Sequence, residues 1–125
     1  MSTISRIRLN DMSINEAMKS LTYNTLNDKF ERYIYECENC DLSILTASHF
    51  NSSKAKTVEI AILYKDGGWF KMYDDEEGVD YDSDASIIHY MPLIGLPLLI
   101  KAFDKARIED IPRLHELFDD VSMYC

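Results

Sequence analysis

Residues 57–65 carry large apolar side chains at every second position from Val58 to Tyr64, and this pattern constrains the fold more than any other feature of the chain. Successive side chains of a strand point to opposite faces of its sheet, so Glu59 faces away from the apolar positions. Asp66 and Gly67 follow, and both tolerate the positive φ of a tight turn. The pattern predicts a β-hairpin whose return strand is residues 69–73. The apolar face of the first strand consists of Val58, Ile60, Ile62 and Tyr64.

Two helices are predicted before this hairpin. Ser13 and Glu16 have the spacing of a capping box, which predicts a helix over residues 13–21. A second apolar stripe at helical spacing predicts another helix over residues 26–38. The two stripes point in different directions and residues 22–25 are poor helix formers, so we expect two separate helices. The second stripe consists of Leu26, Phe30, Tyr33, Ile34 and Cys37.

Two more helices are predicted at the C-terminal end. Residues 96–106 are apolar on nearly all sides and suit a central helix, and Asp110 can cap a last helix that carries Pro112 in its first turn. That last helix is expected to bury Ile111, Leu114, Leu117, Phe118 and Val121 and to carry His115 on its polar side. Further strands are expected at residues 4–9, 42–48 and 85–91.

These elements predict a single α+β domain that spans residues 1–125. We expect an antiparallel sheet of three to four strands, with two N-terminal and two C-terminal helices packed on it. A chain of 125 residues buries enough surface to fold without a disulfide or a metal ion.

The net charge of −9 is concentrated in one short segment. Residues 1–72 carry nine Lys and Arg and nine Asp and Glu, whereas residues 73–100 carry seven acids and no Lys or Arg. Such a segment repels DNA, RNA and anionic lipid, and it attracts a basic protein. The charge distribution therefore predicts a basic protein partner, and it argues against direct contact with nucleic acid or a membrane.

The predicted partner-binding surface combines carboxylates with neighbouring aromatic rings. Clustered acids steer the encounter with a basic partner, and rigid aromatic side chains supply contact energy. Carboxylates spaced along a surface can also imitate the phosphates of DNA. The competing interpretation is a solvated loop that only keeps the chain soluble. The acids are Asp74, Asp75, Glu76, Glu77, Asp80, Asp82 and Asp84, and the aromatic anchors are Trp69, Tyr73 and Tyr81.

No cofactor or metal site is complete in the sequence. Asp80, Asp82 and Asp84 could supply the first three oxygen ligands of a calcium loop. Ala85 and Met91, however, stand where such a loop needs a glycine and a bidentate glutamate. We therefore expect no metal site in this segment.

Cys37 and Cys40 form a lone Cys-x-x-Cys motif. A zinc site needs four ligands, and only the distant His49 and Cys125 could complete one. The pair is predicted to lie at a helix C-terminus beside acidic residues, which should raise the pKa of both thiols and disfavours a redox role. We expect a buried Cys37 and a Cys40 without a chemical role.

No catalytic motif is present: the sequence has no GxSxG, phosphate-binding loop, GxGxxG or HExxH pattern. The histidines, His49, His89 and His115, are scattered along the chain. General-base catalysis needs a base placed against a nucleophile or substrate, and no such pairing is visible in the sequence. We therefore expect a protein that is not an enzyme.

The function expected from these features is inhibition of a basic, nucleic-acid-processing protein by an acidic binding protein. An immunity protein that neutralises a toxic nuclease and a phage anti-CRISPR or anti-restriction protein both fit this description. One alternative is a structural or adaptor subunit that acts through an apolar or homodimer interface, and a second is a small enzyme with an unrecognised site. With no apolar N-terminal segment and no run of about 20 apolar residues, the chain is expected to be cytoplasmic, with free thiols.

Overall fold

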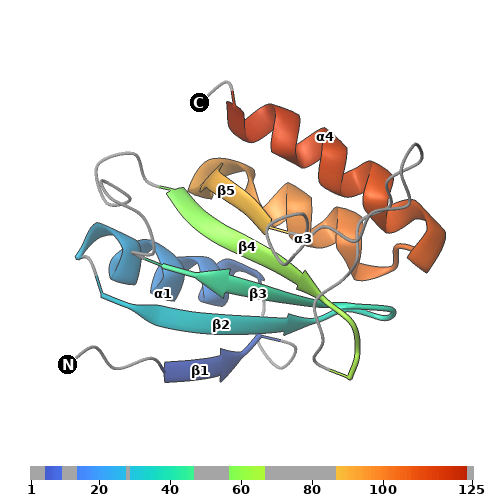
Figure 1. Cartoon of the computed structure of the whole chain (residues 1–125). Helices are drawn as coiled ribbons and strands as arrows, with labels where there is room; N and C mark the ends of the chain where they lie inside the picture. Colours follow the sequence, from blue (N-terminus) through green and yellow to red (C-terminus); the bar gives the residue numbers. More distant parts are fainter. Residues whose placement is uncertain (1–4, 10–13, 28, 47–56, 67–86, 124–125) are drawn as a thin grey trace.

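The computed structural model describes residues 5–9, 14–27, 29–46, 57–66 and 87–123 of the chain. Within these ranges five strands form one sheet, and three α-helices pack against it (Figure 1). The strands are β1 (Ser5–Arg8), β2 (Glu31–Glu36), β3 (Asp41–Leu45), β4 (Thr57–Leu63) and β5 (Ile87–Pro92). The helices are α1 (Ile14–Leu26), α3 (Leu96–Asp104) and α4 (Ile111–Met123), and short 3-10 turns at Leu93–Gly95 and Ile108–Asp110 precede the last two. No helix in the described ranges is long and apolar enough to cross a membrane.

The strands lie in the sheet in the same order as in the chain. Their pairing brings one side chain from every strand into a single row: Ile7, Tyr33, Ile44, Ile60 and Ile88. All members of this central row are buried except Ile7, which is partly buried. The helices complete the core with Ala17, Leu21, Leu96, Leu99, Ile100, Phe103, Ile111 and Phe118.

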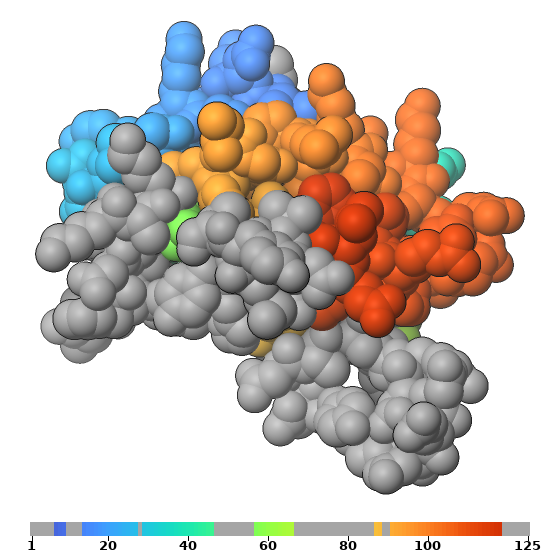
Figure 2. All heavy atoms as spheres, turned by 90° about the horizontal axis from the view of Figure 1, so that it is seen from above, coloured from blue at the N-terminus to red at the C-terminus, as the bar shows by residue number. Residues whose placement is uncertain are grey.

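The helices cover the sheet face that carries the central row. In Figure 1 α1 and α3 lie behind the strands, and α4 runs beside β5. Figure 2, seen from above, places α3 between α1 and α4. The contact between the C-terminal helices includes Phe103 and Phe118, whose ring centroids are 6.0 Å apart. The core cluster therefore lies between one sheet face and the three described helices. On the opposite face Ile34, Ser43 and Ala61 are buried as well.

The sheet is mixed, so the predicted antiparallel sheet of three to four strands is wrong. β1 pairs in parallel with β2, whereas β2, β3, β4 and β5 are antiparallel to their neighbours. Parallel neighbours need a crossover connection, and α1 provides it. The sequence predicts a short first strand, but a pattern this short specifies neither its neighbour nor its direction.

The second N-terminal helix predicted for residues 26–38 is also wrong. Glu31–Glu36 is strand β2, with Tyr33 and Tyr35 on the core face. This stretch combines helical spacing with strand alternation, and its aromatic and β-branched residues favour a strand. Backbone pairing with β1 on one side and β3 on the other decides between the two patterns.

Helix α1 continues through residues 22–25, where the sequence predicts a break. Leu21 and Thr25 lie one turn apart on the same helix face, and both are fully buried. Asn24 donates a side-chain hydrogen bond to the Tyr33 hydroxyl, which ties the helix to β2. Tertiary burial therefore outweighs the weak helix propensity of this stretch.

Helices α3 and α4 confirm the two predicted C-terminal helices. Pro97 and Pro112 each lie in a first helical turn, where no intrahelical N–H is required. The buried stripe of α4 differs from the prediction, because Leu117 is 56 % exposed and His115 is buried. His115 follows Ile111 by one turn and therefore shares its face.

Strand β4 confirms the strand predicted for residues 57–65, but its neighbours differ from the predicted hairpin. Residues 59–63 of β4 pair with β3, and residues 57–61 pair with β5 on the other side. Residues 69–73, the predicted return strand, lie outside the described ranges. Strands β3 and β5 fall within or next to the predicted strands 42–48 and 85–91.

Two adjacent leucines of α3 test this core. Leu99 is fully buried and Leu98 is 67 % exposed. We expect Leu99→Ala to lower the free energy of unfolding by about 2–5 kcal/mol, because it removes buried methyl groups and leaves a cavity. The matched control Leu98→Ala should change it by less than about 0.5 kcal/mol in the same urea titration. Equal effects of both variants would contradict the position of α3.

Candidate functional site

The sequence-predicted acidic surface lies outside the described part of the chain. This holds for Trp69, Tyr73, Asp74, Asp75, Glu76, Glu77, Asp80, Tyr81, Asp82 and Asp84. The structure does describe the strands from which this segment leaves and to which it returns. β4 ends at Leu63, and the first residue of β5, Ile87, pairs with Ala61. The connection therefore begins and ends on neighbouring strands at one end of the sheet.

The turn between β2 and β3 lies at that same end, because Asp41 is paired with Leu63. Continuing the β2–β3 register by one step places Cys37 opposite Cys40. The Cys37 N–H donates to the Cys40 carbonyl oxygen at 2.9 Å, so the two residues face each other as a hydrogen-bonded pair. Both thiols are buried and belong to the core cluster, on the same sheet face as Tyr35. We call residues 37–40 the dithiol turn.

The dithiol turn is anchored to the C-terminal end of α3. The Glu38 N–H donates to the Asp104 carbonyl oxygen at 2.8 Å. The Asn39 side-chain amide donates to the Ala106 carbonyl oxygen at 2.9 Å. Asp104 is the last residue of α3, and its carbonyl oxygen has no partner within the helix, so the Glu38 N–H satisfies an acceptor that would otherwise need another partner. Ala106 lies two residues beyond the end of the helix. The turn is thereby fixed against the helical layer.

Lys65 brings a positive charge to the dithiol turn. Its Nζ donates to the Cys37 carbonyl oxygen at 2.8 Å and forms an ion pair with Asp41 Oδ1 at 2.7 Å. The hydrogen bond with Asp41 is the main reason that the pKa of Lys65 is raised, and partial burial opposes the rise. Lys65 therefore remains an ammonium ion at neutral pH beside the two cysteines.

The two thiols share a hydrogen bond, and their pKa values move in opposite directions. The hydrogen bond with Cys40 raises the pKa of Cys37 far above its usual range, and burial adds to the rise. The same hydrogen bond lowers the pKa of Cys40, although burial and the charge of Asp41 oppose this. The positive charge of Lys65 opposes the rise for Cys37 and adds to the lowering for Cys40. The expectation that both values rise is therefore wrong for Cys40, which is the thiol that ionises first.

Two thiols do not make a structural zinc site, which needs four ligands. Among the residues that the structure describes, no group of three or more His, Cys, Asp or Glu could hold a metal ion. His49 and Cys125, which the sequence offers as further ligands, lie outside the described ranges. Of the other histidines, His89 is in β5 and His115 is on α4, so these two lie on different elements.

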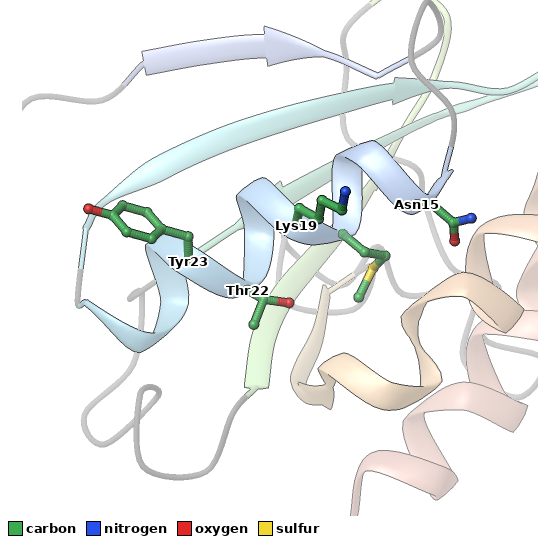
Figure 3. A pocket seen from close by; sticks show the side chains of 5 residues that line it. Asn15, Lys19, Thr22 and Tyr23 are labelled. Atoms are coloured by element: carbon green, nitrogen blue, oxygen red, sulfur yellow. The ribbon is translucent and has the colours of Figure 1, made fainter.

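An open pocket of about 440 Å³ lies on α1 (Figure 3). Its size is within the range of small-molecule sites. Lys29 Nζ lies 4.7 Å from the ring centroid of Tyr23 at one end of this pocket. Neither a histidine nor a carboxylate lines it, so it lacks the acid–base pair that the enzyme alternative requires. The lining residues are Asn15, Met18, Lys19, Thr22 and Tyr23.

Comparison of the chain with protein-family models, curated proteins and solved structures found no match. The chemistry of the candidate site is therefore inferred from its own residues and geometry.

The sequence contains a signal for the dithiol turn that the helical interpretation misses. Apolar or aromatic residues alternate symmetrically about Glu38 and Asn39, at positions 33, 35 and 37 before them and 40, 42 and 44 after them. Such symmetry is typical of a hairpin with a two-residue turn. It would have placed Cys37 and Cys40 opposite each other.

The contact between the dithiol turn and α3 can be tested at Asn39. We expect Asn39→Ala to lower the free energy of unfolding by about 1 kcal/mol, because the Ala106 carbonyl oxygen loses its donor. Glu38→Ala is the matched control, since Glu38 contributes only its backbone N–H, which alanine retains. Urea titration of both variants makes the comparison, and a Glu38→Ala loss as large as that of Asn39→Ala would refute this account.

Proposed function

We propose that this chain is a non-enzymatic binding protein that inhibits a basic, nucleic-acid-processing protein through its acidic segment, residues 74–84. The observation that carries the proposal is the separation of charge along the chain. The described residues carry ten Lys and Arg and thirteen Asp and Glu, a net charge of −3. The acidic segment alone carries seven negative charges and no positive charge. The excess of acid is thus local, which favours directed attraction over general solubility.

Ion pairing among the described residues supports the proposal. Arg8 pairs with Glu36, and Lys65 pairs with Asp41. Arg107 pairs with Glu109 at 3.3 Å and with Asp110 at 3.0 Å. These cations are engaged with carboxylates of the sheet and helices, which leaves less positive charge to neutralise the acidic segment.

The connection that contains the acidic segment has its two ends on neighbouring strands. It connects β4 to β5, which are hydrogen-bonded neighbours and therefore about 4.8 Å apart. Carboxylates emerging from one end of a sheet can present like charges to a cationic channel that normally accepts nucleic-acid phosphates. Aromatic residues within and beside the segment, Trp69, Tyr73 and Tyr81, would supply the contact energy.

An apolar interface is the second candidate function, as in a structural or adaptor subunit or a homodimer. Ile94 is 93 % exposed and Leu98, four positions later, is 67 % exposed. Large apolar side chains exposed next to each other on a helical surface are typical of protein contacts. Binding through this pair would depend little on salt. An interface at the edge of the predicted hairpin is not available along residues 59–61, because β4 has neighbours on both sides there.

Affinity capture from the native host, followed by washes of rising salt concentration, tests the proposal first. We expect a basic nucleic-acid-binding protein that is retained at low salt and released at high salt. A partner that resists salt but is lost with Ile94→Ser and Leu98→Ser would favour the apolar interface instead.

Charge reversal identifies the surface responsible. With the captured partner in hand, we expect the triple variant Asp80→Lys, Asp82→Lys and Asp84→Lys to slow association by roughly ten-fold or more at low salt and to leave the fold intact. The control triple variant Glu16→Lys, Glu109→Lys and Glu116→Lys makes the same change in net charge on exposed residues of other elements. Stopped-flow association and circular dichroism make the measurements. Equal slowing in both variants would show that net charge, and not the acidic segment, sets the rate.

A further inference from the structure

The dithiol turn places two cysteines where a bond between them can form without rearranging the strands. Directly opposed residues of an antiparallel pair have Cα atoms about 4.5–5.5 Å apart, within the range of separations found in disulfides. The side chains of such a pair point to the same face. Cys37 and Cys40 meet this condition through their register and through the 2.9 Å hydrogen bond between their backbones.

The surroundings of the pair make the two thiols differ in pKa and therefore in reactivity. The interaction between the two thiols raises the pKa of Cys37 and lowers that of Cys40, so negative charge is better tolerated on the Cys40 sulfur. The Lys65 ammonium, bonded to the Cys37 carbonyl oxygen, stabilises a thiolate further. Cys40 is thus suited to attack first and Cys37 to resolve. Both are buried, so the reactant must be as small as hydrogen peroxide.

We propose that the dithiol turn is a peroxide-reactive site in which Cys37 and Cys40 are oxidised to an intramolecular disulfide. This inference is independent of the proposed binding function, because it concerns other residues and another reaction.

The chemistry balances with hydrogen peroxide as the oxidant. The Cys40 thiolate attacks one peroxide oxygen, the O–O bond breaks, and hydroxide leaves to take up a proton and become water. Cys40 is then a sulfenic acid. The Cys37 thiolate attacks its sulfur, the S–O bond breaks, the S–S bond forms, and the second hydroxide leaves as water. The two thiols lose two electrons and two protons, and one peroxide is reduced to two waters.

The decisive measurement uses the folded full-length chain with Cys125→Ser, so that only the dithiol turn can react. After treatment with a small excess of hydrogen peroxide, the chain is unfolded, its remaining thiols are alkylated, and its peptides are weighed without reduction. We expect the peptide that contains residues 37–40 to have lost two hydrogens and both alkylation sites, and dithiothreitol to restore them. Unmodified thiols, sulfinic acid or disulfides between chains as the main product would each overturn the proposal.

Variants test the assigned roles. In Cys37→Ala the sulfenic acid should persist on Cys40 and be trapped by dimedone. In Cys40→Ala no disulfide can close within the turn, so the loss of two hydrogens from the peptide that contains residues 37–40 should disappear. Lys65→Gln should slow the wild-type reaction several-fold. If a cysteine variant does not fold, dimedone trapping in the Cys125→Ser chain at early times still decides which thiol reacts first. Sulfenic acid on Cys37 would reverse the assignment and refute the mechanism.

Discussion

Burial of one continuous row of side chains across all five described strands is the interaction on which the rest of the structure depends. The row is Ile7, Tyr33, Ile44, Ile60 and Ile88, and it forms only when each strand adopts its observed register. Because side chains alternate between faces, a slip of one residue in any strand would turn its member of the row away from the helices. The register set by this burial also determines which residues meet at the ends of the strands, including the two cysteines.

The sequence predicts elements well where one pattern has no competitor. Val58, Ile60, Ile62 and Tyr64 recur at the spacing of one strand face, residues 96–106 are mostly apolar, and Pro112 is tolerated in a first helical turn. Residues 26–38 contain two patterns at once, and the choice between them depends on strands 5–8 and 41–45, which lie elsewhere in the chain. Local spacing does not reveal which distant strands will pair with a segment. For this reason the predicted helix over residues 26–38 is wrong, and the parallel pairing of β1 with β2 is missed.

One part of the candidate site can be predicted from the sequence, and another part depends on the tertiary structure. The charge separation that defines the acidic segment is a property of the sequence and needs no fold to detect. The chemistry of Cys37 and Cys40 depends on a turn, on Lys65 from β4's end and on Asp104 from α3, and only the tertiary structure brings these groups together. Assigning the pair to a helix end led to the wrong pKa direction for Cys40, because the hydrogen bond between the thiols requires them to face each other.

Charged groups at one end of the sheet influence the ionisation of the dithiol turn. The chain leaves β4 and enters β5 at the end of the sheet that carries the dithiol turn. There the charge of Asp41 acts to raise the pKa of Cys40, and the charge of Asp104 acts to raise the pKa of both cysteines. Negative charge at this end opposes thiolate formation, and Lys65 works against it from a position where it is hydrogen-bonded to the turn itself. Salt would weaken these contributions from exposed charges more than the interaction within the buried pair.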